Sequence, residues 1–439
     1  MSETINSNYD KLEPLLDKAE CLDKAEKNEY FISKIHISKI KHLHDIDIPL
    51  SDIERKHLVL TGKNGSGKTS VLEMLAPYLE SFVNGFMANN ITCISSLKSS
   101  LEITNIPVPM RTPWQPSIDD YNDELRKFGY FNLDVDFSET ENLIKLYDAG
   151  KFILAYFSVA RTGKMLQPQS PDKTFQIEEK KYSIKSTNGA DKESASNKFI
   201  QYLVNLETDR SFAISKHAID KDSMVQKIDD WFNNFESRLR KIFDDDSLKI
   251  DFDYNNYVFY LSSNKSEKFP LNELSSGYSA IINIIAELIM RMEYHKSNIN
   301  AYDVEGVVLI DEIETHLHVT LQKEILPILI DMFPKIQFIV TTHSPFVLTS
   351  IDNAVIYDLE KQTLVEDLSN YPWSSIVEGY FDTQEDSDLN HDKLLAYEDL
   401  KSRQDSLTSE EELELATLYN DLFPKALSKL RTLQLKYGL

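Results

Sequence analysis

One nine-residue segment restricts the fold of this chain more than any other feature of its sequence. Gly62–Ser70 reads GKNGSGKTS, the spacing of a phosphate-binding loop, and it stands between a predicted strand at His57–Thr61 and a predicted helix at Thr69–Phe82. Glycines let successive backbone N–H groups face phosphate oxygens, and the helix N-terminus adds its positive end. This context predicts an α/β sheet with a nucleotide phosphate site.

The residues of this segment have separate expected roles. Lys68 is expected to reach the β and γ phosphates and to act in catalysis, and the Thr69 hydroxyl is expected to bind Mg²⁺. The predicted nucleotide-binding residues of the segment are Gly62, Lys63, Asn64, Gly65, Ser66, Gly67, Lys68, Thr69 and Ser70.

A second motif is an apolar strand that ends in two carboxylates. Val307–Ile310 runs directly into Asp311 and Glu312, as expected opposite a phosphate-binding loop in a parallel sheet. We expect Asp311 to orient the Mg²⁺ shell. We expect Glu312, which points another way, to accept a proton from the attacking water, because phosphoryl transfer needs mainly positioning and charge stabilisation.

A third motif, LSSGYS at Leu274–Ser279, lies before a predicted helix and resembles the signature of ABC ATPases. Ser276 and Tyr278 stand where that signature usually has glycine and glutamine. The resemblance implies that Ser275, Ser276 and Gly277 bind the γ-phosphate of an ATP held by a second copy of the chain.

A histidine follows the predicted strand Ile336–Thr341. His343 resembles the switch histidine that contacts the γ-phosphate in ABC ATPases, and Glu314–His318 occupies the position of the D-loop, which lines their dimer seam. We do not predict His316 and His318 as metal ligands, because no cysteine or third histidine stands at a suitable spacing.

Together these motifs, spread from Phe31 to Asp358, resemble the RecF-like and SMC-like branch of ABC ATPases. Asp311–His318 and Thr341–Phe346 are similar to stand-alone bacterial ATPases of anti-phage defence systems, such as the Septu ATPase and its retron-linked forms. The resemblance implies ATP and Mg²⁺ as cofactors, slow and partner-regulated hydrolysis, and a homodimer or higher homo-oligomer.

The same resemblance implies that a separate protein cuts nucleic acid. The overcoming-lysogenisation nucleases carry a metal-dependent Toprim domain after the ATPase, and we expect no room for one after Asp358. The chain is therefore expected to regulate or position an effector nuclease. That nuclease is of the HNH type in Septu-like systems, and retron-linked forms add a reverse transcriptase and its DNA product.

An alternative function is a RecF-like DNA repair ATPase that clamps DNA ends. The formal net charge of -24 repels nucleic acid globally, although a local contact with DNA stays open. Steep salt dependence of DNA binding would favour the clamp. A third alternative, an inactive scaffold, is disfavoured because Lys68, Asp311, Glu312 and His343 are all present.

The predicted architecture is an α/β ABC ATPase head, with a mostly parallel sheet plus N-terminal antiparallel strands, a compact inserted α-rich subdomain and a helical C-terminal tail. The expected domains are 1–28, a mobile arm; 29–160, an ATPase lobe with the phosphate-binding loop; 161–247, a mainly helical insertion; 248–370, a second ATPase lobe; and 371–439, an acidic helical tail for association with a partner or a second copy.

The other expected elements follow from apolar periodicity. The stretch Asn89–Tyr121 shows little apolar periodicity. Apolar residues recur at helical spacing after residue 223, at Met224, Ile228, Trp231, Phe235, Leu239 and Ile242. The further expected strands are Phe31–Ile37, Ile46–Leu50, Phe131–Phe137, Lys151–Val159, Leu248–Tyr254, Tyr257–Ser262, Gly306–Ile310 and Ala354–Tyr357, with helices at Ser279–Tyr294 and Leu321–Met332. No glutamine between the phosphate-binding loop and Ser275 has the context of a Q-loop.

The composition favours a cytoplasmic protein. Two cysteines, Cys21 and Cys93, indicate a reducing compartment. The N-terminus lacks the basic start and apolar core of a secretory signal. The longest apolar stretch, Ala280–Met290, is too short to cross a bilayer, so we expect no membrane association.

Overall fold

The computed structural model describes residues 29–102, 113–160, 165–172, 184, 195–215, 221–265, 267–293, 304–365 and 417. The chain divides into two compact units, residues 1–370 and 371–439, and all described residues except residue 417 belong to the first. The predicted N-terminal arm, most of the polar stretch after residue 160 and the acidic tail therefore lie outside the described residues.

The central layer is a six-stranded sheet. In spatial order its strands are β12 (Thr363–Val365), β11 (Ala354–Asp358), β3 (His57–Thr61), β10 (Ile336–Thr341), β9 (Glu305–Ile310) and β5 (Phe152–Phe157). All neighbours pair in parallel except β11 and β12. The mostly parallel sheet expected from the sequence is confirmed.

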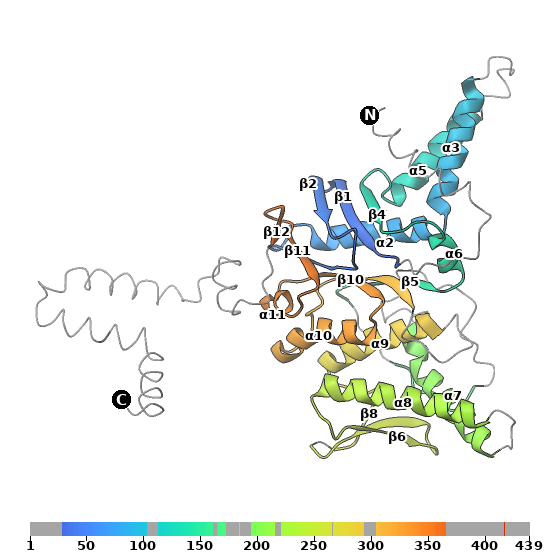
Figure 1. Ribbon diagram of the computed structural model, residues 1–439, viewed down its shortest axis with the longest axis vertical. Helices are drawn as coiled ribbons and strands as arrows, with labels where there is room; N and C mark the ends of the chain where they lie inside the picture. Colours follow the sequence, from blue (N-terminus) through green and yellow to red (C-terminus); the bar gives the residue numbers. More distant parts are fainter. Residues whose placement is uncertain are drawn as a thin grey trace, which may run out of the picture. The chain divides into compact units, whose positions relative to one another are not determined.

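Helices cover both faces of this sheet. Helix α2 (Lys68–Val83) lies on one face, and α9 (Ser276–Glu293) and α10 (Val319–Met332) lie on the other (Figure 1). Every residue of β3 and β10 is buried, because parallel strands covered on both faces have no solvated side. The short helix α11 (Pro345–Leu348) follows β10.

A second sheet of three antiparallel strands confirms the expected N-terminal strands. It has the order β2–β1–β4, with β1 at Ile32–Ile40, β2 at Leu43–Pro49 and β4 at Leu133–Phe137. Buried and more exposed residues alternate along β4, the pattern of a sheet with one covered face. Helix α2 lies between this sheet's strands and the central layer in Figure 1.

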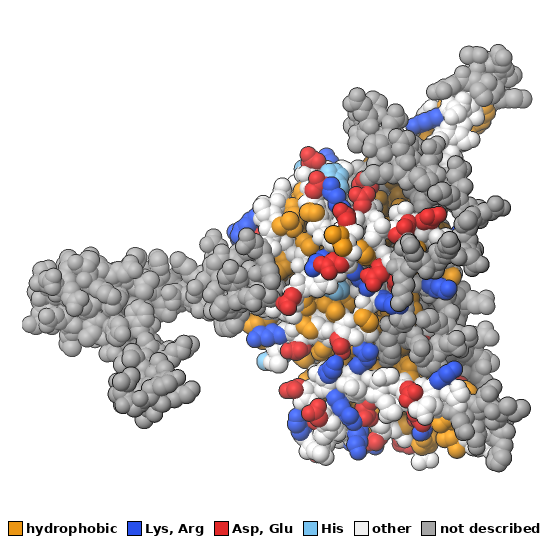
Figure 2. Space-filling view, viewed as in Figure 1, with side chains coloured by type: hydrophobic (Ala, Val, Ile, Leu, Met, Phe, Trp, Pro, Cys, Tyr) orange, Lys and Arg blue, Asp and Glu red, His pale blue; other side chains and the backbone are white. Residues whose placement is uncertain are grey.

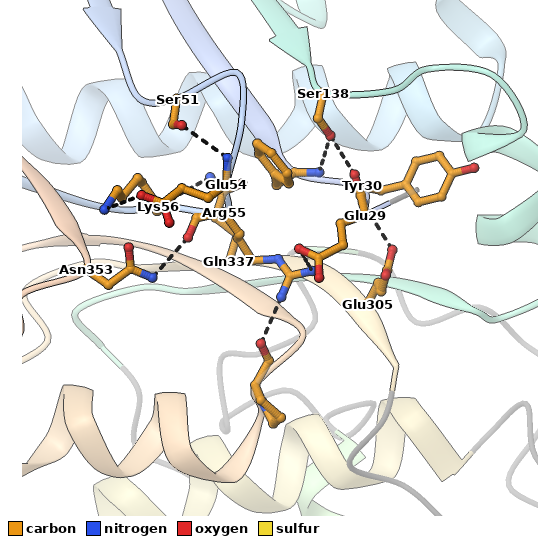
Figure 3. A network of polar contacts seen from close by, with 12 residues as sticks. Glu29, Tyr30, Ser51, Glu54, Arg55, Lys56, Ser138, Glu305, Gln337 and Asn353 are labelled. Atoms are coloured by element: carbon orange, nitrogen blue, oxygen red, sulfur yellow. Dashed lines mark hydrogen bonds and ion pairs between the residues drawn. The ribbon is translucent and has the colours of Figure 1, made fainter. Parts of the chain in front are cut away.

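Gln337 joins the two sheets at the amino end of β10. Its side chain is fully buried; Oε1 accepts a hydrogen bond from the Ile32 N–H (2.7 Å), and Nε2 donates to the carbonyls of Ile32 (2.9 Å) and Lys56 (2.8 Å). Figure 3 shows the surrounding polar contacts, in which the Arg55 guanidinium reaches the Pro334 carbonyl (2.8 Å). A buried amide with both ends bonded incurs little desolvation penalty, so the joint is stable.

A buried histidine makes this joint sensitive to acid. His57 accepts a hydrogen bond at Nδ1 from the Phe338 N–H (3.1 Å), so its ring is neutral. Burial, helped by the charges of Arg55 and Lys56, lowers its pKa to about 4. The unfolded chain binds this proton below about pH 6.5, whereas the folded chain does so only near pH 4, so acid favours unfolding.

We therefore expect the free energy of unfolding to fall by about 3 kcal/mol from His57 alone between pH 6.5 and pH 4. The comparison is with His57→Gln, whose amide oxygen can accept the Phe338 N–H but does not titrate. Urea unfolding of both proteins across this range should show a steeper pH dependence for the parent. Parallel curves would contradict the assignment of a neutral His57.

The stretch from Asn89 to Tyr121, whose little periodicity predicted no element, is largely helical. It contributes to α3 (Phe86–Glu102) and α5 (Trp114–Lys127), which pack side by side and project from the body (Figure 1). The buried side chains of the pair are few, among them Met87, Ile91, Ile94, Ile118 and Leu125. Because each helix buries only a narrow stripe, polar residues dominate the sequence and hide the period.

The helical periodicity found after residue 223 is confirmed in α8 (Lys221–Phe243). Its predicted apolar face is buried except at Met224, which is 40% exposed. Helix α7 (Phe199–Ser215) packs on this face, with Phe199 and Phe235 rings 5.6 Å apart. A third sheet, β6 (Lys249–Asp253), β7 (Val258–Ser262) and β8 (Phe269–Pro270), also packs on α8.

Two short elements complete the described chain, α6 (Leu143–Asp148) before β5 and the 3-10 turn η2 (Ala195–Lys198) before α7. The boundary expected between residues 247 and 248 falls between α8 and the sheet that packs on it. Among the described residues, no helix is both long and apolar enough to cross a membrane.

Candidate nucleotide-binding and hydrolysis site

The phosphate loop, residues 62–70, connects β3 to α2 as the sequence predicts. Gly62 and Gly67 have φ angles of 130° and 100°, a backbone conformation that residues other than glycine rarely adopt. A Cβ on Gly67 would lie 2.9 Å from Leu43 Cδ1 at the start of β2, so a side chain here would also displace Leu43. Lys63, Asn64 and Gly65 form the exposed tip, where they can meet a ligand.

Lys68 is the first residue of α2, and its side chain turns into the phosphate loop. Nζ donates to the carbonyls of Gly62 (2.8 Å) and Lys63 (3.1 Å), and the residue is 5% exposed. Burial lowers the pKa of Lys68, and the charges of Glu312 and other nearby carboxylates oppose this shift. The loop therefore encloses a cation at the place where phosphate oxygens would enter.

Asp311 connects the phosphate loop to the ends of two strands. Its Oδ1 accepts hydrogen bonds from the hydroxyls of Thr69 (3.2 Å) and Thr341 (2.6 Å), and the residue is 1% exposed. In the parallel register Ile310 lies opposite Val340, so Asp311 and Thr341 follow at the same sheet edge. A carboxylate beside a hydroxyl supplies the oxygen ligands that Mg²⁺ prefers, so Thr69 and Asp311 fit such an ion.

Glu312 lies next to Asp311 but bonds to different groups. Its backbone has a φ of 44°, and its N–H donates to Thr341 Oγ1 (2.7 Å). Its carboxylate accepts a hydrogen bond from Thr315 Oγ1 (3.2 Å). A left-handed conformation in a residue other than glycine is uncommon and often marks a functional site. In these contacts the half-buried Glu312 carboxylate and the Asp311 carboxylate accept hydrogen bonds from different hydroxyl groups.

His343 stands just past β10, half-buried, near the same cation. Burial, together with the charge of Lys68, lowers its pKa, although Glu314, Glu312 and Asp311 oppose the shift. The imidazole is therefore neutral near neutral pH and can donate one hydrogen bond from its ring. The phosphate loop, Asp311, Glu312 and His343 are thus brought together.

The residues of the third motif have other neighbours. Ser276 and Gly277 begin α9, directly after Ser275, and no hydrogen bond joins any of the three to residues 62–70, all of which are described. A Cβ on Gly277 would lie 3.1 Å from the His316 carbonyl oxygen, so this motif contacts the turn after β9 instead. Tyr278 stacks on Phe243 with ring centroids 4.2 Å apart.

Three polar residues of the site were not assigned roles from the sequence. Thr341 bonds to both Asp311 and Glu312; Glu314 bonds to the segment that carries His343; and Asp358, beside Thr61 across the sheet, contributes to the potential at Lys68. Their common sequence signal is a polar residue at or just after the end of a buried strand.

The expected Q-loop glutamine is still unassigned. Gln167 bonds to the Tyr257 carbonyl (2.7 Å), and Gln201, on α7, bonds to the Ser170 carbonyl (3.1 Å). Gln115 lies on α5 and bonds to Asp119 (3.0 Å). Gln176 lies outside the described residues.

Comparisons with known proteins agree with these motifs. A family model described as "AAA domain, putative AbiEii toxin, Type IV TA system" matches residues 170–349, which include the third motif, Asp311, Glu312 and His343. The match covers less than half of the chain and does not include the phosphate loop.

Three curated relatives extend the similarity. The Septu protein PtuA of Bacillus mycoides (strain KBAB4) is 28% identical over 365 residues, which cover 82% of this chain and 44% of the relative. The Retron Vc95 probable ATPase of Vibrio cholerae serotype O1 biovar El Tor is 24% identical over 69% of this chain and 68% of the relative. The Retron Ec83 probable ATPase of Escherichia coli is 45% identical over 20% of this chain and 16% of the relative. The chain thus spans less than half of the first relative.

A solved structure of an SMC head bound to the C-winged helix domain of ScpA aligns with a TM-score of 0.35 at 13% identity, covering 77% of this chain and 95% of that chain. A score of this size carries no weight for the fold, which follows from the six-stranded sheet with the phosphate loop between β3 and α2. The chain is thus an α/β protein that carries these motifs and is similar in sequence to the Septu protein PtuA and to retron probable ATPases.

Proposed function

We propose that this ATPase binds ATP with Mg²⁺ at residues 62–70, hydrolyses it with Glu312 as the general base, and uses the cycle to regulate a separate effector. The observation that carries the proposal is the pair of hydrogen bonds from Thr69 and Thr341 to Asp311. Thr69 and Asp311 would hold Mg²⁺, whose positive charge would stabilise the negative charge that develops on the phosphate oxygens. Lys68 would orient the phosphates, and His343 would donate a hydrogen bond to the transferred phosphoryl group.

Two copies would close two ATP molecules between them. The support is that no hydrogen bond joins Ser275–Gly277 to the phosphate loop of the same chain, and that the place of a Cβ on Gly277 lies beside the turn after β9. The γ-phosphate would then meet Ser275 and the backbone of Ser276 and Gly277 of the opposite copy. Hydrolysis would require closure, so an isolated copy would turn over slowly.

Gly277→Asp tests this shared site. The new carboxylate has no room beside His316 and would face the γ-phosphate, so we expect ATP-dependent dimers to disappear and the hydrolysis rate to fall by about 100-fold or more. Each copy should still bind ATP. Light scattering with a slowly hydrolysed analogue measures the dimer, and Asn264→Asp adds the same charge on a surface turn as the control. A variant that dimerises like the parent would contradict the shared site.

We propose a bacterial defence role through a separate nuclease, because the relatives are named as a Septu protein and retron ATPases. The charge of the chain supports a protein partner in the cytoplasm over bulk DNA: the formal net charge is -24, and acidic and basic side chains are interspersed over the face shown in Figure 2. The chain itself would cut no nucleic acid.

The experiment is affinity purification of the tagged chain expressed from its native operon. Co-purification of an HNH-type nuclease, alone or with a reverse transcriptase and its DNA, is the expected result. Recovery of the ATPase with bulk DNA only, and with a steep salt dependence of that binding, would instead favour the RecF-like clamp.

A further inference from the structure

One carboxylate of the site belongs to neither the phosphate loop nor the proton transfer. Glu314 lies in the D-loop turn, defined here as Glu314–His318, which follows β9. Its Oε1 accepts a hydrogen bond from the His343 N–H (2.6 Å), and its Oε2 accepts one from Thr342 Oγ1 (2.8 Å). Both oxygens therefore hold the segment Thr342–Ser344, which follows β10 and is called the switch segment below.

A second bridge joins the same two segments. Gln322, in the first turns of α10, accepts a hydrogen bond from Ser344 Oγ (2.7 Å) and donates one to the Leu317 carbonyl (2.9 Å). The bonds to Glu314 are the stronger pair, because the acceptor is charged and the distances are short. The D-loop turn and α10 thus hold the switch segment through its side chains and the His343 N–H, while the Thr342 N–H donates to the Leu60 carbonyl of β3 (3.0 Å).

The D-loop turn has a second neighbour on its other side. The His316 carbonyl oxygen lies 3.1 Å from the place of a Cβ on Gly277, at the start of α9, and His316 itself has a φ of 68°. The place of that Cβ also lies 3.9 Å from Leu317 Cδ2, so the start of α9 and the turn are neighbours, and a large shift of α9 toward the turn would press on the His316 carbonyl. The turn therefore links the start of α9 to the backbone of His343.

We propose that Glu314 is a positioning residue that couples the D-loop turn to the switch histidine. It holds the backbone of His343, so closure of a second copy against the turn and the start of α9 sets where the imidazole meets the γ-phosphate. This inference rests on the proposed function and adds its regulation: a site whose turn is displaced binds ATP but hydrolyses it slowly.

The test compares Glu314→Ala and Glu314→Gln in the full chain. Alanine removes both acceptors, and we expect kcat to fall by about 100-fold while KM for ATP changes by less than about threefold, because the phosphate loop is intact. Glutamine keeps one oxygen for the His343 N–H, so we expect kcat to recover to within about tenfold of the parent. Glu324→Ala, an exposed carboxylate on α10, is the matched control and should leave kcat unchanged.

The outcomes separate this inference from the proposed function. Parent-like kcat in Glu314→Ala, or no recovery in Glu314→Gln, overturns the positioning role while hydrolysis by the parent stands. Parallel changes in kcat and KM also overturn it, because they indicate damage to nucleotide binding. Absence of hydrolysis by the parent overturns both. Thermal unfolding of each variant confirms that the comparison is between folded proteins.

Discussion

Glu312→Gln is expected to reduce kcat for ATP hydrolysis by about 10²–10⁴-fold, the range for loss of a general base. The substitution keeps the size of the side chain and an oxygen that can accept the Thr315 hydrogen bond, so the turn should keep its shape. Asp311, Thr69 and Lys68 retain their contacts. ATP should therefore bind as in the parent and, in the proposed shared site, stay trapped in a stable dimer.

Two measurements are needed for this variant. Steady-state phosphate release measures kcat, and light scattering at saturating ATP and Mg²⁺ measures the dimer. Glu324→Gln makes the same chemical change on the exposed surface of α10 and serves as the control. A monomer at saturating ATP would refute the shared site, whereas an unchanged kcat would refute the role of Glu312 alone.

Lys68→Ala is expected to have the second large effect. This substitution should weaken the binding of ATP, whereas Glu312→Gln should slow its hydrolysis. Nζ occupies the phosphate loop and bonds to the carbonyls of Gly62 and Lys63, where it would meet the β and γ oxygens. Charge-assisted hydrogen bonds contribute about 1.5–3 kcal/mol each, and each 1.4 kcal/mol is tenfold in affinity. We therefore expect Kd for ATP to rise by about 100-fold.

Isothermal titration with ATP and Mg²⁺ measures this change. Lys56→Ala is the control, because it removes an equal charge that pairs with Glu54 at the surface (2.7 Å), away from the phosphate loop. Its affinity should stay within about threefold of the parent. Undiminished affinity in Lys68→Ala would exclude the phosphate-binding role of the loop.

The agreement between sequence and fold is best where structure is local or the burial pattern is simple. The strand His57–Thr61 has the predicted bounds, and the helix after the phosphate loop differs from its prediction by one residue at each end. Fully buried strands and a helix start after glycines leave clear signals in a single sequence. The projecting pair α3 and α5 left none, because its helices bury narrow stripes mainly against each other.

The residues of the site also fall into those that the local sequence indicates and those that only the strand register brings together. Motif spacing pointed to Lys68, Asp311 and Glu312, because each follows a glycine loop or a buried strand that ends at one sheet edge. The resemblance to ABC ATPases pointed to His343. Thr341 lies in the same motif as His343, but the sequence assigned it no role, because its bonds to Asp311 and Glu312 depend on the register of β10 against β9. One residue of register shift would turn this hydroxyl to the other face.

The sequence by itself therefore determined the class of site, a phosphate loop with two carboxylates and a histidine at strand ends. Only the tertiary structure decided which side chains hold one another. Glu314 meets His343 across 29 positions of sequence, at a distance set by the packing of α10 and the pairing of β9 with β10. Such contacts depend on ångström-scale positions, which strand periodicity and motif spacing do not encode.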